Sequence, residues 1–216
     1  MSYDLTNQRV LITAASRGIG KATAAAFQSA GAKVAICARN EIQLLETKMH
    51  LETLGNQSVL AKVADLSIPE DINQLVDFVE SDFGGIDILV NNSGGPPPGT
   101  HEQIDDEQWS KAFEATLCSS IRITNRVLPR MKNKGSGRII NLSSYSVKQP
   151  MSSMMLSNSI RLAALGWSKT LSNELARFNI LVNTICTGWT KTNRVEELLE
   201  NRAMEQDTTN AEIEKA

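Results

Sequence analysis

Histidine and cysteine are scarce in this chain, which contains 2 histidines and 3 cysteines among 216 residues. Cys37, Cys118 and Cys186 lie far apart along the sequence and have neither metal-binding nor redox spacing. Free thiols are expected, and they suit a reducing compartment such as the cytoplasm. His50 and His101 are isolated from each other. No metal site is therefore predicted.

The chain also lacks a strong charge of either sign and a long apolar run. Lys and Arg number 22 against 24 for Asp and Glu, a net charge of -2. Without a basic excess, a nucleic-acid partner is not expected. No apolar run approaches the roughly 20 residues that span a bilayer, and the N-terminal residues lack the pattern of a signal peptide. The length suits one domain over residues 1–216, with no membrane partner and a cytoplasmic location.

What the sequence does contain is a regular alternation of apolar strand-like runs and longer helical patterns. The strands are uniformly apolar, as in parallel sheets that are buried on both faces. This predicts a doubly wound, Rossmann-like α/β sheet in three layers. The expected strands are 9–13, 33–37, 58–65, 86–92, 137–144 and 180–186, and the expected helices are 18–30, 41–54, 69–83, 105–132 and a long one that ends near 178. Ligands of such sheets bind beyond the carboxyl ends of the strands, so the loops that follow the strands are the informative ones.

The turn after the first strand reads TAASRGIG, residues 13–20. Gly18 and Gly20 allow the backbone to approach a ligand closely, and the helix that begins here directs its N–H groups and its positive dipole end at the turn. A tight turn without a ligand is the alternative. The position of the TAASRGIG turn, after the first strand and before the first helix, favours a pyrophosphate site.

Two arginines indicate which dinucleotide is bound. Arg17 lies in the first turn, and Arg39 follows the second strand with Asn40 beside it. An NAD-binding protein would usually place Asp or Glu there for the ribose 2′-hydroxyl, whereas arginine can pair with a 2′-phosphate. The sequence therefore predicts NADP(H). The alternative is that Arg39 is a solvated surface residue.

Five motifs together resemble the short-chain dehydrogenase/reductase family over nearly the whole chain, and are most similar to its β-ketoacyl carrier-protein reductase branch. They are TAASRGIG at 13–20, ADL at 64–66, NNSG at 91–94, GRIINLSS at 137–144 and LVNTICTGWTKT at 181–192. The resemblance implies a nicotinamide-cofactor site. Its expected residues are Thr13, Ser16, Arg17, Ile19, Arg39, Asn40, Asp65, Leu66, Asn92, Ser93, Gly94, Arg161, Gly188, Thr190 and Thr192.

The chain departs from the family at its catalytic residues. The family uses a Ser at the end of the fifth strand, a Tyr and a Lys four positions apart on the next helix, and an Asn on the preceding helix. By that spacing the Ser corresponds to Ser144, but the Tyr, Lys and Asn correspond to Ser157, Arg161 and Thr116. The chain has only 2 tyrosines, and neither follows residue 145. No shift of register therefore restores the Tyr–Lys pair.

The residues at the positions of the family's Tyr, Lys and Asn are polar, but none of them can act as a general acid as the tyrosine does. Arg161 can contact the ribose and supply a fixed positive charge, but its pKa above roughly 12 makes it a poor proton donor. Ser144 and Ser157 can polarise a carbonyl through hydrogen bonds. Tyr145 becomes a substitute acid only if its loop turns it inward; the other interpretation is a surface or packing tyrosine.

These observations predict an NADP(H)-dependent short-chain oxidoreductase with an altered active site. It would transfer hydride between the nicotinamide and a small-molecule carbonyl or secondary alcohol. The alternative is a catalytically impaired NADP(H)-binding protein that acts as a sensor or a partner subunit. A homo-oligomer, dimer or tetramer, is expected. Family members usually continue into a further strand that this sequence does not contain. Either the chain is a fragment or truncated form of a longer protein, or the strand is absent and an edge of the sheet is left uncovered.

Overall fold

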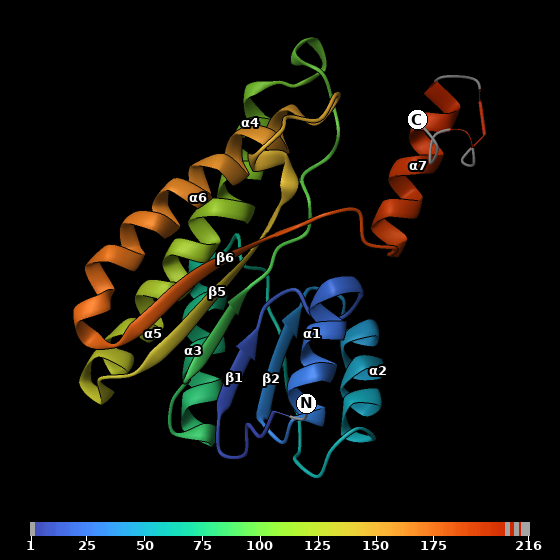
Figure 1. Cartoon of the computed structure of the whole chain (residues 1–216). Coiled ribbons are helices and arrows are strands. Elements are labelled where there is room, and N and C mark those ends of the chain that lie inside the picture. Colours follow the sequence, from blue (N-terminus) through green and yellow to red (C-terminus); the bar gives the residue numbers. More distant parts are fainter. Residues whose placement is uncertain (1–2, 206–207, 210–211, 213–216) are drawn as a thin grey trace.

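A parallel sheet of six strands forms the centre of the computed structural model, which describes residues 3–205, 208, 209 and 212 (Figure 1). The strand order is β3-β2-β1-β4-β5-β6, so strands β2 and β3 are added on one side of β1 and strands β4 to β6 on the other. This is the predicted doubly wound architecture, and the prediction is confirmed. The strands are β1 (Arg9–Ile12), β2 (Lys33–Ala38), β3 (Leu60–Val63), β4 (Ile88–Asn91), β5 (Gly137–Ser144) and β6 (Ile180–Thr187).

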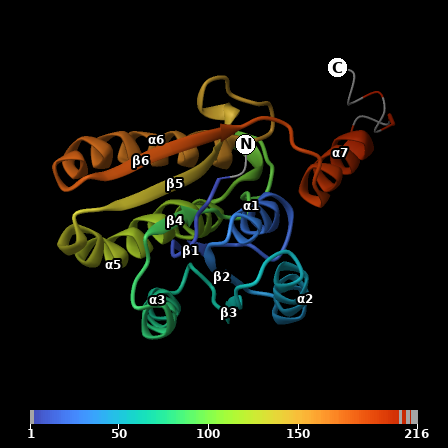
Figure 2. The same ribbon diagram turned by 60° about the horizontal axis from the view of Figure 1, so that its bottom comes forward.

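Helices lie on both faces of the sheet and complete the three layers (Figures 1 and 2). One apolar core joins α1 and α2 to the sheet, and a second joins α3, α5 and α6 to its other face. The helices are α1 (Gly18–Ser29), α2 (Glu41–Glu52), α3 (Pro69–Phe83), α4 (Asp106–Phe113), α5 (Ser119–Lys134), α6 (Met155–Leu175) and α7 (Asn193–Glu205). In both views α7 stands apart from the sheet, beyond the end of β6.

Strand β1 shows why the central strands are apolar at every position. Val10 and Ile12 pack into the core under α1 and α2, whereas Leu11 packs into the core under α3 and α5. Strand β6 is different, because Leu181 and Ile185 are 46% and 49% exposed. Burial on both faces was predicted for all strands; it is wrong for β3, where Val63 is 44% exposed, and wrong for β6. The outer face of β6 lies at the sheet edge, where α1 and α2 do not reach it.

The predicted helix 105–132 is interrupted. A π-helical turn, Glu114–Cys118, separates α4 from α5. The start of α4 follows the sequence signal, because the Asp105 side chain accepts a hydrogen bond from the Gln108 amide at 2.8 Å and forms a capping box. A π turn has i→i+5 bonding and contains one residue more than an α turn. Thr116 therefore belongs to the irregular part of the helix.

The amino-terminal ends of β1 and β4 are joined by a charge cluster of Arg9, Asp87 and Lys134. Asp87 is 5% exposed and accepts hydrogen bonds from Arg9 Nε at 2.7 Å and Lys134 Nζ at 2.5 Å. Burial acts to raise the pKa of Asp87, but the hydrogen bonds from both cations outweigh it and lower that pKa to about 2. This cluster lies at the end of the sheet opposite to the carboxyl ends of the strands. It stabilises the fold and takes no part in ligand binding.

Candidate active site

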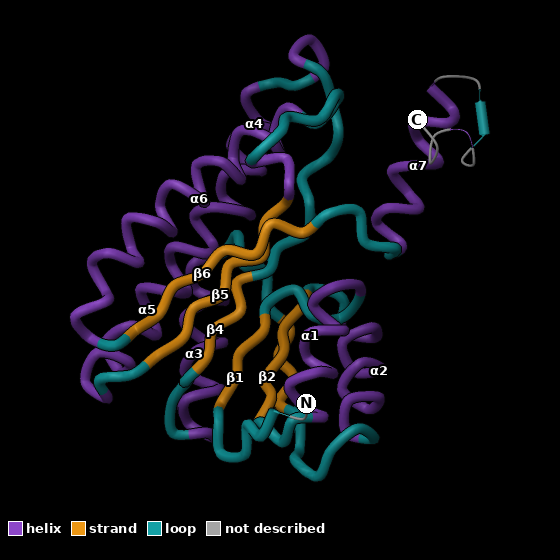
Figure 3. The backbone as a smooth tube through the Cα atoms, in the orientation of Figure 1, coloured by secondary structure: helices purple, strands orange, loops and turns teal. Residues whose placement is uncertain are grey.

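A cavity of about 870 Å³ opens at the carboxyl ends of the strands, within the range of small-molecule and cofactor sites. The loops that follow the strands gather at this edge of the sheet (Figure 3). Nearly all predicted site residues line the cavity. They are Ser16, Arg17, Ile19, Arg39, Asn40, Asp65, Leu66, Asn92, Ser93, Gly94, Thr116, Ser144, Ser157, Arg161, Gly188, Thr190 and Thr192.

Thr13 is the predicted cofactor residue that does not line the cavity. It is 1% exposed, and its hydroxyl donates to the Asn92 carbonyl at 2.6 Å and accepts from the Asn92 amide at 2.8 Å. The Asn92 side chain in turn donates to the Ala14 carbonyl at 3.0 Å. Thr13 therefore ties the loop after β1 to the loop after β4 and supports the site from beneath.

The first turn fits a diphosphate. A Cβ on Gly20 would lie 2.6 Å from the Ala14 carbonyl oxygen, and Gly18 has a φ of +55°, so both positions require glycine. Arg17 is the N-cap of α1, which has no side-chain cap and no acidic residue in its first turn. The amide groups at the start of α1 are therefore open to an anion in the cavity.

Arg39 follows β2 and lines the cavity. Its side chain is 80% exposed and sits 3.8 Å from Asp65. Burial acts to raise the pKa of Asp65, but hydrogen bonds from Ser67 and the charge of Arg39 lower it overall. Asn40 lines the cavity as well, and its side-chain oxygen accepts from the Gln43 amide at 2.9 Å and caps α2. An exposed ion pair of this kind contributes little, so Arg39 can exchange Asp65 for a phosphate at low cost.

Packing at the start of α6 fixes which side chains face the cavity. Leu156 and Ile160 are buried against Ala112 of α4 and Leu117 of the π turn. The neighbouring positions on α6 therefore point to the strand ends. These positions carry the serine and the arginine that replace the family's Tyr and Lys.

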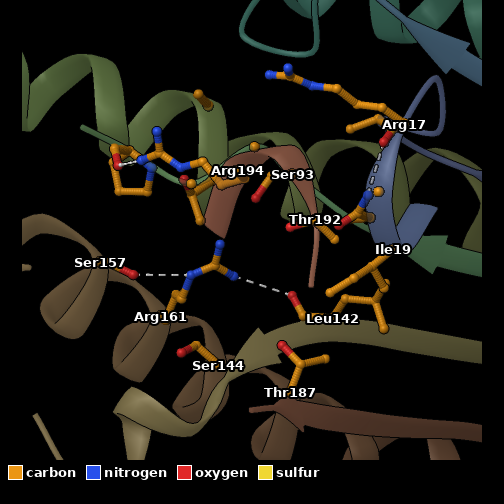
Figure 4. Close-up of a pocket in the computed structure, with 18 of the residues that line it drawn as sticks. Arg17, Ile19, Ser93, Leu142, Ser144, Ser157, Arg161, Thr187, Thr192 and Arg194 are labelled. Carbon is orange, nitrogen blue, oxygen red and sulfur yellow. Dashed lines mark hydrogen bonds between the residues drawn. The ribbon is translucent and has the colours of Figure 1, made fainter. Parts of the chain in front are cut away.

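Ser157 and Arg161 are joined by a hydrogen bond (Figure 4). Arg161 Nε donates to Ser157 Oγ at 3.2 Å, and Arg161 Nη1 donates to the Leu142 carbonyl of β5 at 3.4 Å. Burial lowers the pKa of the Arg161 guanidinium, and the nearby charge of Arg194 lowers it further. An arginine nevertheless remains charged in a protein. The guanidinium is thus held against the end of β5, with Ser157 in front of it.

Ser144 is held in a similar way at the end of β5. Its Oγ accepts a hydrogen bond from the Ser146 amide at 3.2 Å. Thr116, 5% exposed, lines the cavity from the π turn. Tyr145 also lines the cavity, and its hydroxyl accepts from Trp189 Nε1 at 3.2 Å. The loop does turn Tyr145 inward, as a substitute acid would require, but the hydroxyl faces the half-exposed Trp189.

Arg194 is a site residue that the sequence alone did not reveal. It lies near the start of α7 and donates to the Pro96 carbonyl at 2.9 Å. It therefore joins the segment after β6 to the proline-rich loop after β4. The Gly99 amide of that loop donates to the Ser153 carbonyl at 2.7 Å, which closes the mouth from the α6 side. The sequence could have indicated Arg194 only through its position, because it lies two residues after the predicted cofactor residue Thr192.

Other chemistry is not supported among the described residues. No cluster of three or more His, Cys, Asp or Glu side chains in them could hold a metal ion. Cys37 is a free, buried thiol, and burial raises its pKa to about 12, so it is unreactive. Of the helices described, none combines the length and the apolar character that crossing a membrane requires.

Comparisons with known proteins agree with this geometry. The family model of short chain dehydrogenases matches residues 8–203. The 3-oxoacyl-[acyl-carrier-protein] reductase FabG of Vibrio cholerae is 31% identical over 195 residues, covering 90% of this chain and 78% of that protein.

Two solved structures are informative. L-sorbose reductase from Gluconobacter frateurii, complexed with NADPH and L-sorbose, has a TM-score of 0.90 at 31% identity, covering 94% of this chain and 78% of that one. An NADPH-bound short chain oxidoreductase from Pseudomonas aeruginosa PAO1, described as containing an atypical catalytic center, has a TM-score of 0.86 at 27% identity, covering 92% and 77%. With its strand order, its glycine turn and this family match, the chain belongs to the short chain dehydrogenases.

Proposed function

We propose that the protein is an NADP(H)-dependent oxidoreductase that transfers hydride between the nicotinamide and a small-molecule carbonyl or secondary alcohol. The observation that carries the proposal is the hydrogen bond from Arg161 Nε to Ser157 Oγ at 3.2 Å. A guanidinium can only donate, so Ser157 must accept in this bond. Its own hydroxyl hydrogen is then available to a substrate oxygen in the cavity.

Ser144 is also oriented to donate its hydroxyl hydrogen to a substrate oxygen. A backbone amide can only donate, and the Ser146 amide lies 3.2 Å from Ser144 Oγ. Two hydroxyl donors therefore face one cavity, and both can bond a carbonyl oxygen on which negative charge develops. Donors that are fixed in advance stabilise that charge without reorganising during the reaction. The Arg161 charge behind Ser157 adds to this stabilisation.

The bound nicotinamide would supply or accept the hydride. The chain's residues would bind the rest of the cofactor: the start of α1 the diphosphate, Arg39 a 2′-phosphate, and Arg161 the ribose beside the nicotinamide. Arg39 at the position of the usual acidic residue supports NADP(H) over NAD(H). NADPH bound to the Gluconobacter and Pseudomonas neighbours is consistent with the same choice.

The proton must come from water or through a hydroxyl, because a serine does not titrate in the range where tyrosine acts. Losing general acid catalysis costs typically 10² to 10⁴ in rate. The proposed enzyme is therefore slow with simple ketones and faster with activated carbonyls. It should not show the pH dependence that a catalytic tyrosine would give.

NADPH oxidation by the purified protein, measured against a panel of ketones and aldehydes, tests the proposal. Turnover that disappears in the Ser144→Ala/Ser157→Ala double variant supports it. NADPH binding without turnover of any carbonyl would refute it in favour of the catalytically impaired NADP(H)-binding protein. Failure to bind NADPH would refute both.

A homo-oligomer, dimer or tetramer, is part of the same proposal. The exposed Leu181 and Ile185 on β6 support it, because apolar side chains at a sheet edge favour association. Light scattering of the purified protein tests this. A monomer at micromolar concentration would contradict it.

A further inference from the structure

A second, much smaller cavity lies beside the active-site cavity, enclosed by the ends of β4, β5 and β6 and by residues of α5 and α6. Its volume is about 20 Å³, and a single water molecule needs about 10–15 Å³. Five residues line both this small cavity and the active-site cavity: Ser93, Thr116, Leu142, Ser143 and Arg161. Arg161 is therefore part of the wall between the two.

Two buried oxygen atoms in the lining of the small cavity have no hydrogen-bond partner among the described residues. They are Asn91 Oδ1 and Ser143 Oγ. Asn91 is 3% exposed and Ser143 is 9% exposed, so bulk solvent does not satisfy them. Buried polar atoms nearly always have a partner, either in the protein or in an ordered water molecule. These two oxygens therefore point to a bound molecule that the protein chain itself does not supply.

The Asn91 side chain is held in one orientation by its amide nitrogen. Asn91 Nδ2 donates to Asn141 Oδ1 at 2.8 Å and to Thr124 Oγ1 at 3.1 Å. Asn141 Nδ2 donates to Ser168 Oγ at 2.9 Å, which keeps the Asn141 oxygen toward Asn91. Turning the Asn91 amide over would bring two amide oxygens together. Asn91 Oδ1 is therefore fixed as an acceptor that no protein donor fills.

Ser143 lies beside the Arg161 guanidinium. Arg161 Nη1 donates to the carbonyl of Leu142, the residue before Ser143, at 3.4 Å (Figure 4). Side chains alternate along a strand, so Ser143 lies on the same face of β5 as Asn141. Hydrogen bonds to Ser157 and Leu142 use two of the five N–H groups of Arg161, and three are left. A molecule in a cavity of this size that Asn91, Ser143 and Arg161 all line is within reach of all three.

The chemistry of these three groups selects the ligand. Asn91 Oδ1 can only accept a hydrogen bond, the Arg161 guanidinium can only donate, and the Ser143 hydroxyl can do both. An anion could not donate to Asn91, and a cation would be repelled by Arg161. A water molecule accepts from Arg161, donates to Asn91 and forms a third bond with Ser143. About three hydrogen bonds is the usual number for a buried water molecule.

We propose that the small cavity binds one water molecule, and that this water holds the Arg161 guanidinium in place. Arg161 is then fixed by Ser157, by the Leu142 carbonyl and by the water, and two N–H groups remain for the nicotinamide ribose. Asn91 and Ser143 are positioning residues, because they act through Arg161. The water site itself does not depend on the proposed function, whereas the value of a fixed Arg161 for Ser157 and the ribose rests on it.

A crystal structure of the full chain with NADP⁺, at a resolution that shows ordered water, tests the site directly. One water should lie within hydrogen-bond distance, about 2.7–3.2 Å, of Asn91 Oδ1, Ser143 Oγ and a nitrogen of Arg161. A small cavity without density between well-ordered side chains would overturn the inference. So would a water that bonds Asn91 and Ser143 but not Arg161.

The rate at which the Arg161 N–H hydrogens exchange with solvent tests the positioning role. It is measured by NMR on protein labelled with ¹⁵N-arginine, and the Arg161→Lys variant, which lacks the signal, identifies it. Ser143→Ala removes one of the three partners of the water. The Arg161 hydrogens should then exchange about fivefold faster or more, the effect of losing one hydrogen bond. An unchanged exchange rate would show that the water does not hold Arg161.

Ser119→Ala is the matched control. Ser119 is a serine of α5 that is 2% exposed, and its hydroxyl donates to the Ala115 carbonyl at 2.8 Å. It lines neither cavity, so its loss should leave the exchange rate of Arg161 unchanged. If both serine variants accelerate the exchange equally, a general loosening of the fold is the cause and the positioning role is wrong. Thermal unfolding of each variant measures such loosening independently.

The two proposals fail in different ways, because neither the crystal structure nor the exchange rate requires turnover. If carbonyls are reduced but no water bonds Arg161 in the small cavity, the water site is wrong and the oxidoreductase stands. If the water has its three contacts and Ser143→Ala accelerates the exchange, but no carbonyl is ever reduced, the water site stands and the oxidoreductase is wrong.

Discussion

Replacing Ser157 with alanine isolates the proposed role of its hydroxyl. The hydroxyl belongs to a residue that is 4% exposed, and Arg161 Nε holds it at 3.2 Å. Loss of one preorganised donor to a developing oxyanion lowers kcat by about 10² to 10³. Ser144 still supplies a second donor, so the residual activity should lie above that of the double variant. KM should change much less, because the bond strengthens mainly in the transition state.

The same substitution has a stability cost that must be separated from the catalytic one. Without Ser157 Oγ, the Nε–H of Arg161 loses its acceptor, and a charged donor without a partner costs about 1 to 3 kcal/mol. Arg161 borders an open cavity. Water can reach it there, so we expect a value near the lower limit. Urea unfolding measures this loss, and kcat is compared only for protein that remains folded.

Ser168→Ala is the control for a buried serine on the same helix. Ser168 is 2% exposed and bonds Asn141 and Thr184 at 2.9 and 2.8 Å. It does not line the cavity. Its loss should lower stability and leave kcat within about twofold of the wild type. If the Ser157→Ala variant, folded and saturated with NADPH, also keeps its kcat, then Ser157 does not bond the substrate oxygen and the proposed mechanism is wrong.

Three further predictions concern the cofactor and the fold. Arg39→Ala should lower kcat/KM for NADPH about tenfold or more relative to NADH, the expected loss of one charged phosphate contact; an unchanged ratio would mean that Arg39 does not read the phosphate. Gly20→Ala should lower the melting temperature and weaken NADPH binding, because its Cβ would lie 2.6 Å from the Ala14 carbonyl oxygen. Gly166→Ala is its control, since a Cβ there meets nothing within 4 Å. Asp87→Asn should cost about 2 to 3 kcal/mol at pH 7, because the pKa of Asp87 falls from 3.8 to about 2 and each unit is worth about 1.4 kcal/mol. Because the folded pKa is lowered, this contribution is complete above about pH 4 and is lost as pH falls toward 2, so urea unfolding of the wild type and the variant should converge there. A pH-independent difference would show that the charge of Asp87 is not the cause.

The fold could be predicted because its signals are local and repeated. Each central strand is a short apolar run, and some helix starts carry their own marker, such as the Pro69 that opens α3 and the Asp105 that caps α4. The carboxyl ends of parallel strands share one edge of the sheet. Placing the motifs after the strands was therefore enough to bring residues as distant as Arg17 and Thr190 into one cavity.

The features that were missed depend on contacts between distant segments. Exposure of Ile185 on β6 is decided by which helices cover that face, and the sequence of β6 does not contain this information. Thr13 lies in a predicted motif, but its hydroxyl bonds Asn92 beneath the cavity instead of lining it. The contact of Arg194 in α7 with Pro96 in the loop after β4 joins segments that lie 98 residues apart in the sequence. Secondary-structure propensity and hydrophobic periodicity carry no information about contacts between such distant residues.

The π turn at Glu114–Cys118 changes how an insertion or deletion in this region should be understood. Because the turn accommodates one residue beyond the α-helical count, removing a single residue there would restore an uninterrupted α-helix. Everything before it would then keep nearly its present orientation relative to α5, because a π turn and an α turn with one residue fewer make about the same rotation. Ala112 would keep its packing against Leu156, and the wall of the cavity would present the same face. In this helix, an alignment gap of one residue at the π turn marks the loss of a bulge, and the surface before it is unturned.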